Sequence, residues 1–253
     1  MTRYISQHNP SMPQMAAFIE QLGREGIPHD STIIYRGRNT VYTTNIKGNK
    51  LNIKVFKKPN SFNAYIYTTL RKSKAHRSYL NALRLLDLGI NTPQPIGYGE
   101  VIDKHKLTYS YYVSEQIDVQ NIRNWEEKAD CEPLLRALAK EIIKFHQAGV
   151  WHKDFSGGNI LYSGNEVTGY KFYYVDLNRM EFGVKSRRKL MTMFRDMNHS
   201  AIETEKIARY YAQETGEDPD KIVQEALKAH NKCKHTRQRK KWLKSLFKWR
   251  KKA

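Results

Sequence analysis

The segment VWHKDFSGGNILY, residues 150–162, places polar residues that can carry out chemistry within an apolar frame. His152, Asp154 and Asn159 follow the order H-x-D-x-x-x-x-N, and Asp176 closes a predicted strand seventeen positions after Asn159. Phosphoryl transfer needs a carboxylate that accepts the proton of the attacking hydroxyl, and an amide oxygen and a second carboxylate that bind magnesium ions. Asp154 fits the first role, and Asn159 and Asp176 fit the other two.

A site for nucleotide phosphates is indicated further upstream. Lys54 lies on a predicted strand in LNIKVF, where its ammonium group can reach the α- and β-phosphates of ATP. Gly37 in YRGRNTVY marks a hairpin that would cover these phosphates, and Arg38 and Glu115 complete the predicted nucleotide-binding set. A strand lysine is often a solvated edge residue, and one glycine usually only forms the turn. The joint order of these features along the chain is what favours a kinase-like site.

Hydrophobic periodicity predicts the elements that position these residues. Residues 11–26 predict a short helix, and residues 31–59 predict three antiparallel strands separated by turn signals. Residues 73–89 predict a helix that ends at a glycine, and residues 101–117 predict a further hairpin. The first half of the chain is therefore predicted to be mostly sheet with one helix.

The second half has a helical pattern. Residues 132–149 predict an amphipathic helix that leads directly into the candidate catalytic segment, and two helical stretches are predicted within residues 185–230. We therefore predict an α+β, bilobal protein-kinase-like fold, with an antiparallel sheet and one helix in the first lobe and mostly helices in the second. The predicted segments are an N-terminal helical extension (1–30), the first lobe (31–113), the second lobe (114–230) and a basic amphipathic tail (231–253).

The tail carries most of the positive charge. The net charge of the chain is +19, the last acidic residue is Glu225, and residues 226–253 contain twelve Lys or Arg. On a helical wheel the tail places its large apolar residues on one side and most lysines opposite: Trp242, Leu243, Leu246, Phe247 and Trp249. This pattern predicts an interfacial helix on an anionic inner-leaflet surface. The alternatives are a helix face that packs on the second lobe and, less favoured because no recognised motif is present, nucleic-acid binding.

The remaining composition argues for a cytoplasmic protein. The N-terminal residues contain no apolar run of signal-peptide length, and no stretch reaches the roughly 18 apolar residues that span a bilayer. Cys131 and Cys233 have no paired spacing, so neither a disulfide framework nor a zinc site is expected. We expect a peripheral protein on the inner face of the cytoplasmic membrane, with no nucleic-acid partner.

Five segments of the chain resemble bacterial lipopolysaccharide kinases, which phosphorylate 3-deoxy-manno-octulosonic acid (Kdo) or heptose in the inner core. The matching segments are YRGRN at 35–39, KVFKKPN at 54–60, SKAHRSYLNALRLLDLGINTPQPI at 73–96, HKDFSGGNIL at 152–161 and VDLNRM at 175–180. The resemblance covers about residues 30–210. The G-I-x-T-P-x-P exit from the helix, and D-L-N-R in place of D-F-G, are more particular to this group than the catalytic loop.

The resemblance implies an ATP- and Mg²⁺-dependent kinase that acts on a sugar hydroxyl of a lipopolysaccharide inner-core precursor. It implies that Asp154 is the base, that Asn159 and Asp176 are the magnesium ligands and that Lys54 binds phosphate. A small-molecule or glycolipid acceptor also fits the residues, because Ser156 stands where protein serine/threonine kinases usually have a lysine, and no A-P-E follows Asp176.

One departure from the kinase pattern is large. The helix after Lys54 should supply a glutamate that pairs with this lysine, but residues 56–86 contain no acidic residue, and His76 stands at the expected place. Asn52 also replaces the small residue usual beside an adenine ring. Either another group orients Lys54, or ATP binding is weak, or the protein is a catalytically silent kinase-like membrane adaptor. For Lys54 we predict a salt bridge to Asp176.

Overall fold

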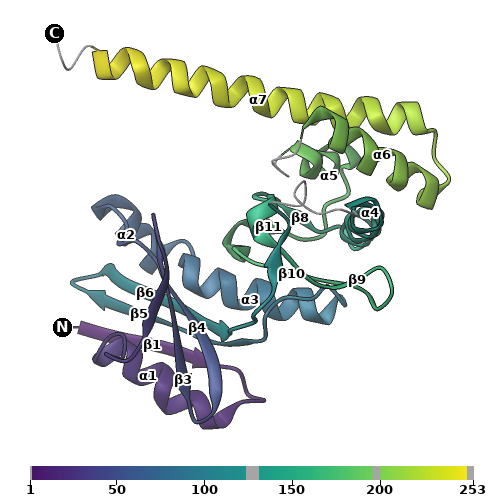
Figure 1. Cartoon of the computed structure of the whole chain (residues 1–253). Helices are drawn as coiled ribbons and strands as arrows, with labels where there is room; N and C mark the ends of the chain where they lie inside the picture. The colour runs from purple at the N-terminus through teal and green to yellow at the C-terminus, as the bar shows by residue number, and fades with distance from the viewer. Residues whose placement is uncertain (1, 124–130, 196–199, 250–253) are drawn as a thin grey trace. The chain divides into compact units, whose positions relative to one another are not determined.

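The structure is a computed structural model that describes residues 2–123, 131–195 and 200–249 (Figure 1). The chain divides into two compact units, and each is described by itself. The first unit comprises Met1–Asp118 and Tyr173–Arg179, and the second comprises Val119–Phe172 and Met180–Ala253. The segment that carries Asp176 therefore belongs to the first unit, although most of the chain around it in sequence belongs to the second.

The first unit is built on a six-stranded antiparallel sheet in the order β1-β5-β6-β4-β3-β2. Its strands are β1 (Thr2–His8), β2 (Thr32–Arg36), β3 (Thr40–Ile46), β4 (Asn49–Val55), β5 (Pro95–Asp103) and β6 (Lys106–Glu115). The predicted three strands and the predicted hairpin are confirmed as β2–β4 and β5–β6. Residues 1–30, predicted as a helical extension, contribute both β1 and a helix to this unit. β1 was not predicted, because its mostly exposed residues lack an alternating apolar pattern.

One face of this sheet is covered by α1 (Ala16–Arg24), which follows the short 3-10 helix η1 (Pro13–Met15). The apolar residues of this layer form one buried cluster: Met15, Phe18, Ile19, Leu22, Leu51, Ile53, Ile96, Tyr111 and Val113. The Tyr111 hydroxyl also donates a hydrogen bond to the Ile19 carbonyl. Burial of these side chains fixes the register of β4, since a shift of one residue would expose Leu51 and Ile53.

Two helices of the first unit connect β4 to β5. The predicted helix at 73–89 is confirmed as α3 (Lys74–Asp87), and the Ser73 side chain accepts a hydrogen bond from the His76 N–H as its N-cap. The helix before it, α2 (Ser61–Thr69), was not predicted, and the Asn60 side chain caps it by accepting from the Asn63 N–H.

The segment 173–179 is held in the first unit by hydrogen bonds to α3 and to the loop after it. The Asn81 side chain donates to the Leu177 carbonyl at 2.7 Å, and the Thr92 hydroxyl donates to the Tyr174 carbonyl at 2.8 Å. The Tyr174 N–H donates to the Asn91 carbonyl at 3.1 Å. These bonds place Asp176 on the same unit as Lys54.

The second unit is mostly helical. Its α-helices are α4 (Cys131–Gln147), α5 (Arg187–Leu190), α6 (Ala201–Thr215) and α7 (Pro219–Trp249), and its 3-10 helices are η3 (Gly157–Asn159) and η5 (Met191–Arg195). A further 3-10 helix, η4 (Leu177–Arg179), belongs to the first unit. Its strands are β7 (Gln120–Asn121), β8 (Trp151–His152), β9 (Ile160–Asn165), β10 (Gly169–Tyr174, which runs into the first unit) and β11 (Met180–Glu181). The helix predicted over 132–149 is confirmed as α4, and Gly149 follows it in the left-handed region with φ +61°.

The predicted tail continues a longer helix. α7 runs from Pro219 to Trp249, and its buried anchor residues Ile222, Val223 and Ala226 lie near its beginning. Trp242 is 60% exposed, and the placement of the other large apolar side chains of the tail lies outside the described residues. Within the described part of the chain, no helix has the length and apolar character needed to cross a membrane.

Candidate active site

The Lys54 ammonium and the Asp176 carboxylate form an ion pair, with Nζ 2.9 Å from Oδ1. Lys54 lies on β4, whose register is fixed by the buried cluster beneath α1, and Asp176 lies on the segment tethered to α3. The two side chains are 18% and 29% exposed, so solvent weakens their attraction less than that of a surface pair. The expected salt bridge is confirmed.

Asp176 has an unusual backbone conformation. Its φ is +60°, a left-handed value that non-glycine residues adopt rarely and that surrounding contacts must maintain. The Asn178 side chain donates to Asp176 Oδ1 at 2.5 Å, and Lys54 binds the same oxygen. These two donors hold the same carboxylate oxygen in place.

His76, which stands where a glutamate is expected, makes an aromatic contact. The His76 ring stacks on Tyr98 with centroids 4.5 Å apart, and burial, aided by the charge of Lys72, lowers the His76 pKa. An imidazole ring is either neutral or cationic, so His76 cannot act as an anionic partner for a lysine. The carboxylate on Lys54 comes from Asp176 instead. Asn52, on the same strand, donates to the Gln116 side chain at 2.7 Å.

The candidate catalytic loop is ordered by its own backbone. The Asn159 side-chain amide donates to the Asp154 main-chain carbonyl at 2.8 Å, and the Asp154 N–H donates to His152 Nδ1 at 3.2 Å. His152 is buried, so this bond ties the loop to the core of the second unit. A Cβ at Gly158 would lie 2.3 Å from Arg123 Nη2, so the glycine allows a guanidinium to approach the loop. Sequence reasoning missed Arg123.

The three other predicted nucleotide-binding residues lie in the first unit. The Gly37 N–H donates to the Asn39 carbonyl, and a Cβ at Gly37 would lie 2.5 Å from the Tyr35 hydroxyl. Arg38, next in the hairpin, is exposed and lines a pocket. Glu115 ends β6 with an exposed side chain. Lys54 and Asp176 are thus brought together in one unit, while Asp154 and Asn159 are brought together in the other.

Residues 35–215, more than half of the chain, match the lipopolysaccharide kinase (Kdo/WaaP) family. The chain belongs to this family. The resemblance seen in its motifs is therefore confirmed. The match includes Lys54, Asp154, Asn159 and Asp176, and it ends before the basic tail.

Two curated relatives of this chain within the lipopolysaccharide kinase family are 3-deoxy-D-manno-octulosonic acid kinases. The protein of Vibrio cholerae serotype O1 is 30% identical over 121 residues, which cover 46% of this chain and 48% of the relative. The protein of Vibrio parahaemolyticus serotype O3:K6 is 26% identical over 146 residues, which cover 54% of this chain and 58% of the relative. The chain thus spans about half the length of the curated relatives it matches.

Two solved structures confirm the protein-kinase-like fold of this family member. WaaP in complex with acyl carrier protein superposes with a TM-score of 0.60 at 16% identity, covering 94% of this chain and 98% of that one. The Rio2 kinase complex with ADP, Mg²⁺ and phosphoaspartate from Chaetomium thermophilum superposes with a TM-score of 0.52 at 14% identity, covering 90% and 76%. At these identities the likeness concerns the fold alone.

The candidate ligand set in this lipopolysaccharide kinase family chain suits magnesium. Mg²⁺ is usually bound by one or two side-chain oxygens, by substrate phosphates and by water. Asn159 uses its amide nitrogen toward the loop backbone, so its oxygen is the atom of the right type for a cation. A carboxylate has about four acceptor positions, so the two donors at Asp176 Oδ1 do not exhaust it. In the described ranges, no group of three or more His, Cys, Asp or Glu forms a separate metal site.

Sequence reasoning also missed a cluster of cations in the first unit of this kinase-family chain. Six of them, none of which was predicted as functional, line the same pocket as Arg38: Lys57, Lys58, Arg71, Lys74, Arg77 and Arg179. The signal that pointed to five of them was the absence of any acidic residue from 56 to 86, which sequence reasoning used only to note a missing glutamate, and Arg179 lies outside that stretch.

Proposed function

We propose that this chain is an ATP- and Mg²⁺-dependent kinase that phosphorylates a sugar hydroxyl, of Kdo or heptose, in a lipopolysaccharide inner-core precursor. The observation that carries the proposal is the Lys54–Asp176 ion pair, formed by residues 122 positions apart in a chain of the lipopolysaccharide kinase family. Kinases that transfer the γ-phosphate need a phosphate-binding lysine and a metal-binding aspartate held in fixed positions, and Lys54 and Asp176 are residues of these two types held by one ion pair.

The proposed roles follow the chemistry of each side chain. Asp154 accepts the proton of the acceptor hydroxyl, which turns the oxygen into a better nucleophile. Lys54 binds the α- and β-phosphates, beneath the hairpin that carries Gly37 and Arg38, and Glu115 contributes to nucleotide binding. Asn159 and Asp176 would hold magnesium, which when bound neutralises negative charge on the phosphates.

A phosphate-transfer assay tests the proposal directly. The protein is incubated with ATP labelled at the γ-phosphate, Mg²⁺ and isolated inner-core precursors that end in Kdo or in heptose. We expect label in one of the two precursors, and none when magnesium is chelated. Folded protein that binds ATP but labels neither precursor would contradict the proposal and would favour the silent kinase-like adaptor, for which the replacement of the expected glutamate by His76 is the supporting observation.

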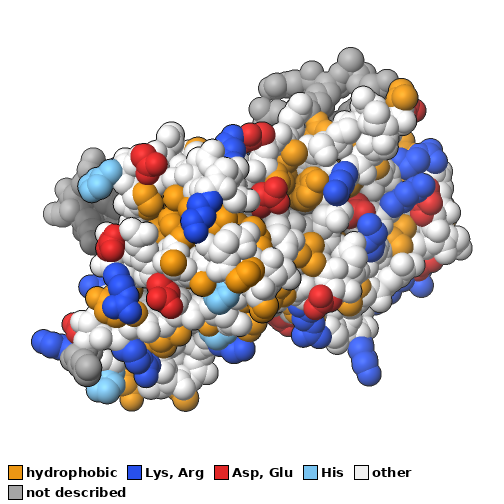
Figure 2. All heavy atoms as spheres, turned by 90° about the horizontal axis from the view of Figure 1, so that it is seen from below, with side chains coloured by type: hydrophobic (Ala, Val, Ile, Leu, Met, Phe, Trp, Pro, Cys, Tyr) orange, Lys and Arg blue, Asp and Glu red, His pale blue; other side chains and the backbone are white. Residues whose placement is uncertain are grey.

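We also propose that the basic tail attaches the kinase to the anionic inner face of the cytoplasmic membrane. Its support is the continuation of α7 to Trp249, beyond the buried anchor residues, together with the 60% exposure of Trp242. If the acceptor is bound to the membrane, such attachment would keep the kinase at the same surface as its substrate. Figure 2 shows that, on the face it displays, described Lys and Arg side chains are interspersed with acidic ones rather than gathered into one basic groove, so this face offers no support for nucleic-acid binding.

Removal of residues 232–253 should release the protein from anionic vesicles. Each Lys or Arg near an anionic leaflet contributes about 1 kcal/mol, and burial of large apolar side chains adds a hydrophobic contribution. Sedimentation with anionic vesicles at low and physiological salt measures the loss. Phosphorylation of a membrane-embedded acceptor should fall, while activity on a soluble sugar fragment should stay nearly unchanged.

The truncation preserves the packed part of α7. Ile222, Val223 and Ala226 remain, and so does His230, whose ring contacts the Thr204 hydroxyl. Trp242→Ala is a milder companion variant that removes one exposed apolar side chain and no charge. Equal vesicle binding by the truncated and full-length proteins would show that the tail does not bind membranes.

A further inference from the structure

A pocket of about 340 Å³ in the first unit is lined by seven Lys or Arg side chains, and none of the described residues that line it is acidic. It lies among the hairpin of Arg38, the residues that lead into α2, the first turns of α3, and β6. Asn178 and Arg179, directly after the Asp176 segment, complete the lining. Because Asn178 donates to Asp176, the pocket lies one hydrogen bond away from the proposed magnesium ligand.

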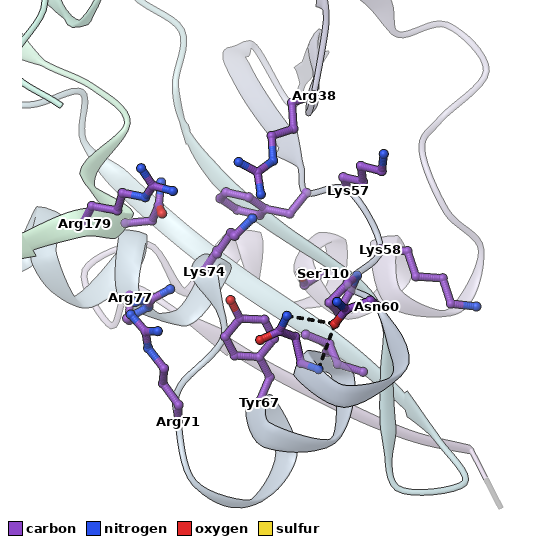
Figure 3. A pocket seen from close by; sticks show the side chains of 15 residues that line it. Arg38, Lys57, Lys58, Asn60, Tyr67, Arg71, Lys74, Arg77, Ser110 and Arg179 are labelled. Carbon is purple, nitrogen blue, oxygen red and sulfur yellow. Dashed lines mark hydrogen bonds between the residues drawn. The ribbon is translucent and has the colours of Figure 1, made fainter. Parts of the chain in front are cut away.

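Four of the cations converge on the pocket. Figure 3 shows Arg38, Lys74, Arg77 and Arg179 extending toward the same space from three different elements, whereas Lys58 points away from it. Tyr67 and Ser110 add hydroxyl groups to the lining. Guanidinium and ammonium groups together with hydroxyls are the donors that bind phosphate and carboxylate oxygens.

This arrangement of charge is unfavourable for the protein alone. Burial lowers the pKa of Lys74, the neighbouring charges of Arg38, Arg179 and Arg77 lower it further, and the charge of Asp176 raises it. The pKa of Arg77 is also lowered, first by burial and then by Arg71. Cations that repel one another in a partly buried site cost stability, which an anionic ligand would restore.

The helix termini strengthen this electrostatic preference. The N-terminus of an α-helix carries a partial positive charge, and acidic residues are favoured in its first turn. Neither α2 nor α3 has an acidic residue there, and Lys74 and Arg77 occupy the first turn of α3. The sequence therefore adds positive charge where the backbone is already positive, in contrast to the usual stabilising pattern.

We propose that this pocket binds a multiply charged oxyanion, a phosphate or clustered carboxylates, that is carried by the sugar acceptor. The assignment to the acceptor rests on the proposed function. Four converging cations exceed what a single negative charge requires, so the ligand has more than one.

Arg38, predicted from the sequence as a nucleotide-binding residue, lines this pocket, but the nucleotide is a poorer occupant for two reasons. Lys54, the predicted lysine for the nucleotide phosphates, does not line the pocket, and it is already paired with Asp176. The sugar named in both curated relatives is an acid, so an acceptor of that class carries at least one carboxylate near its reactive hydroxyls. A pocket that holds such a group beside Asn178 would keep the acceptor close to Asp176, the proposed magnesium ligand.

Calorimetric titration with inorganic pyrophosphate, without magnesium, tests the pocket independently of catalysis. Lys74→Gln and Arg77→Gln should each weaken binding roughly ten- to hundred-fold, because each removes a charge-assisted hydrogen bond. Lys72→Gln is the matched control, since Lys72 is exposed just before α3 and does not line the pocket. It should bind within about two-fold of wild type. Unchanged pyrophosphate binding by Lys74→Gln and Arg77→Gln, or a loss in Lys72→Gln as large as theirs, would overturn the proposal.

Thermal unfolding separates a binding role from a structural one. Without ligand, Lys74→Gln should unfold at the same temperature as wild type or higher, because a mutually repelling charge is removed. Pyrophosphate should raise the unfolding temperature of wild type and of Lys74→Arg but not of Lys74→Gln. The binding role would be contradicted by two results together. Lys74→Gln would unfold at a lower temperature than wild type, and Arg179→Gln would bind pyrophosphate as wild type does. These residues would then have a structural role.

Steady-state kinetics identify which substrate carries the oxyanion. Lys74→Gln should raise KM for the acceptor roughly ten- to hundred-fold and leave KM for ATP within about two-fold of wild type. A rise in KM for ATP alone would mean that the pocket binds nucleotide phosphates, contrary to the proposal. If wild type transfers no phosphate at all, the proposed function fails, whereas the pyrophosphate titration still decides whether the pocket is an oxyanion site.

Discussion

Replacement of Asp154 by asparagine should lower kcat by roughly 10²- to 10⁴-fold and leave ATP binding nearly unchanged. The carboxylate can accept the proton of the acceptor hydroxyl, and the amide cannot. The variant should keep two contacts that order the loop, because the main-chain carbonyl and N–H of Asp154 make them with Asn159 and His152, and the substitution leaves the main chain in place. The measurement is kcat with the sugar acceptor, together with the ATP- and Mg²⁺-dependent rise in unfolding temperature.

Glu166→Gln is the matched control for this prediction. It makes the same carboxylate-to-amide change on the same unit, at an exposed position in the turn between β9 and β10. It should retain wild-type kcat. Turnover by Asp154→Asn equal to that of Glu166→Gln would exclude Asp154 as the base, and a parallel loss of ATP binding would point to a distorted loop.

Substitution of either member of the Lys54–Asp176 pair should lower kcat/KM for ATP by roughly 10²- to 10³-fold. Lys54→Met removes the predicted phosphate contact, and Asp176→Asn removes a predicted magnesium ligand. Each single change also leaves a partly buried charge without its partner. The double variant should therefore lose little more than the worse single variant, because the two groups act as a unit.

Lys50→Met provides the control for Lys54. Lys50 lies on the same strand and is also paired with a carboxylate, that of Asp118 at 2.5 Å, but its side chain is 51% exposed. Its removal should change kcat/KM for ATP by less than about two-fold, as is usual for surface ion pairs. If Lys54→Met behaved in the same way, the ion pair would have no part in nucleotide binding, and the silent-adaptor alternative would gain support.

Elements whose sequence signals are local were the ones predicted correctly. The amphipathic pattern at 73–89 and the glycine that ends it predicted α3, because a helix with one apolar face and a terminal glycine needs little information from outside the segment. The helix leading into the candidate catalytic loop was predicted for the same reason. By contrast, β1 was missed, since an edge strand with exposed side chains is held mainly by its pairing with β5.

The sequence by itself determined which residue types are available for phosphoryl transfer and their order along the chain: Lys54, Asp154, Asn159 and Asp176. It also determined the tail charge and the absence of acid from 56 to 86. Only the tertiary structure decided how the predicted Lys54–Asp176 contact is held, because the hydrogen bonds to Asn81 and Thr92 draw residues 173–179 into the first unit. It likewise decided that Arg38, Lys74 and Arg179, distant in sequence, share one pocket. Charge and spacing are local properties of a chain, whereas the convergence of like charges depends on which elements pack together.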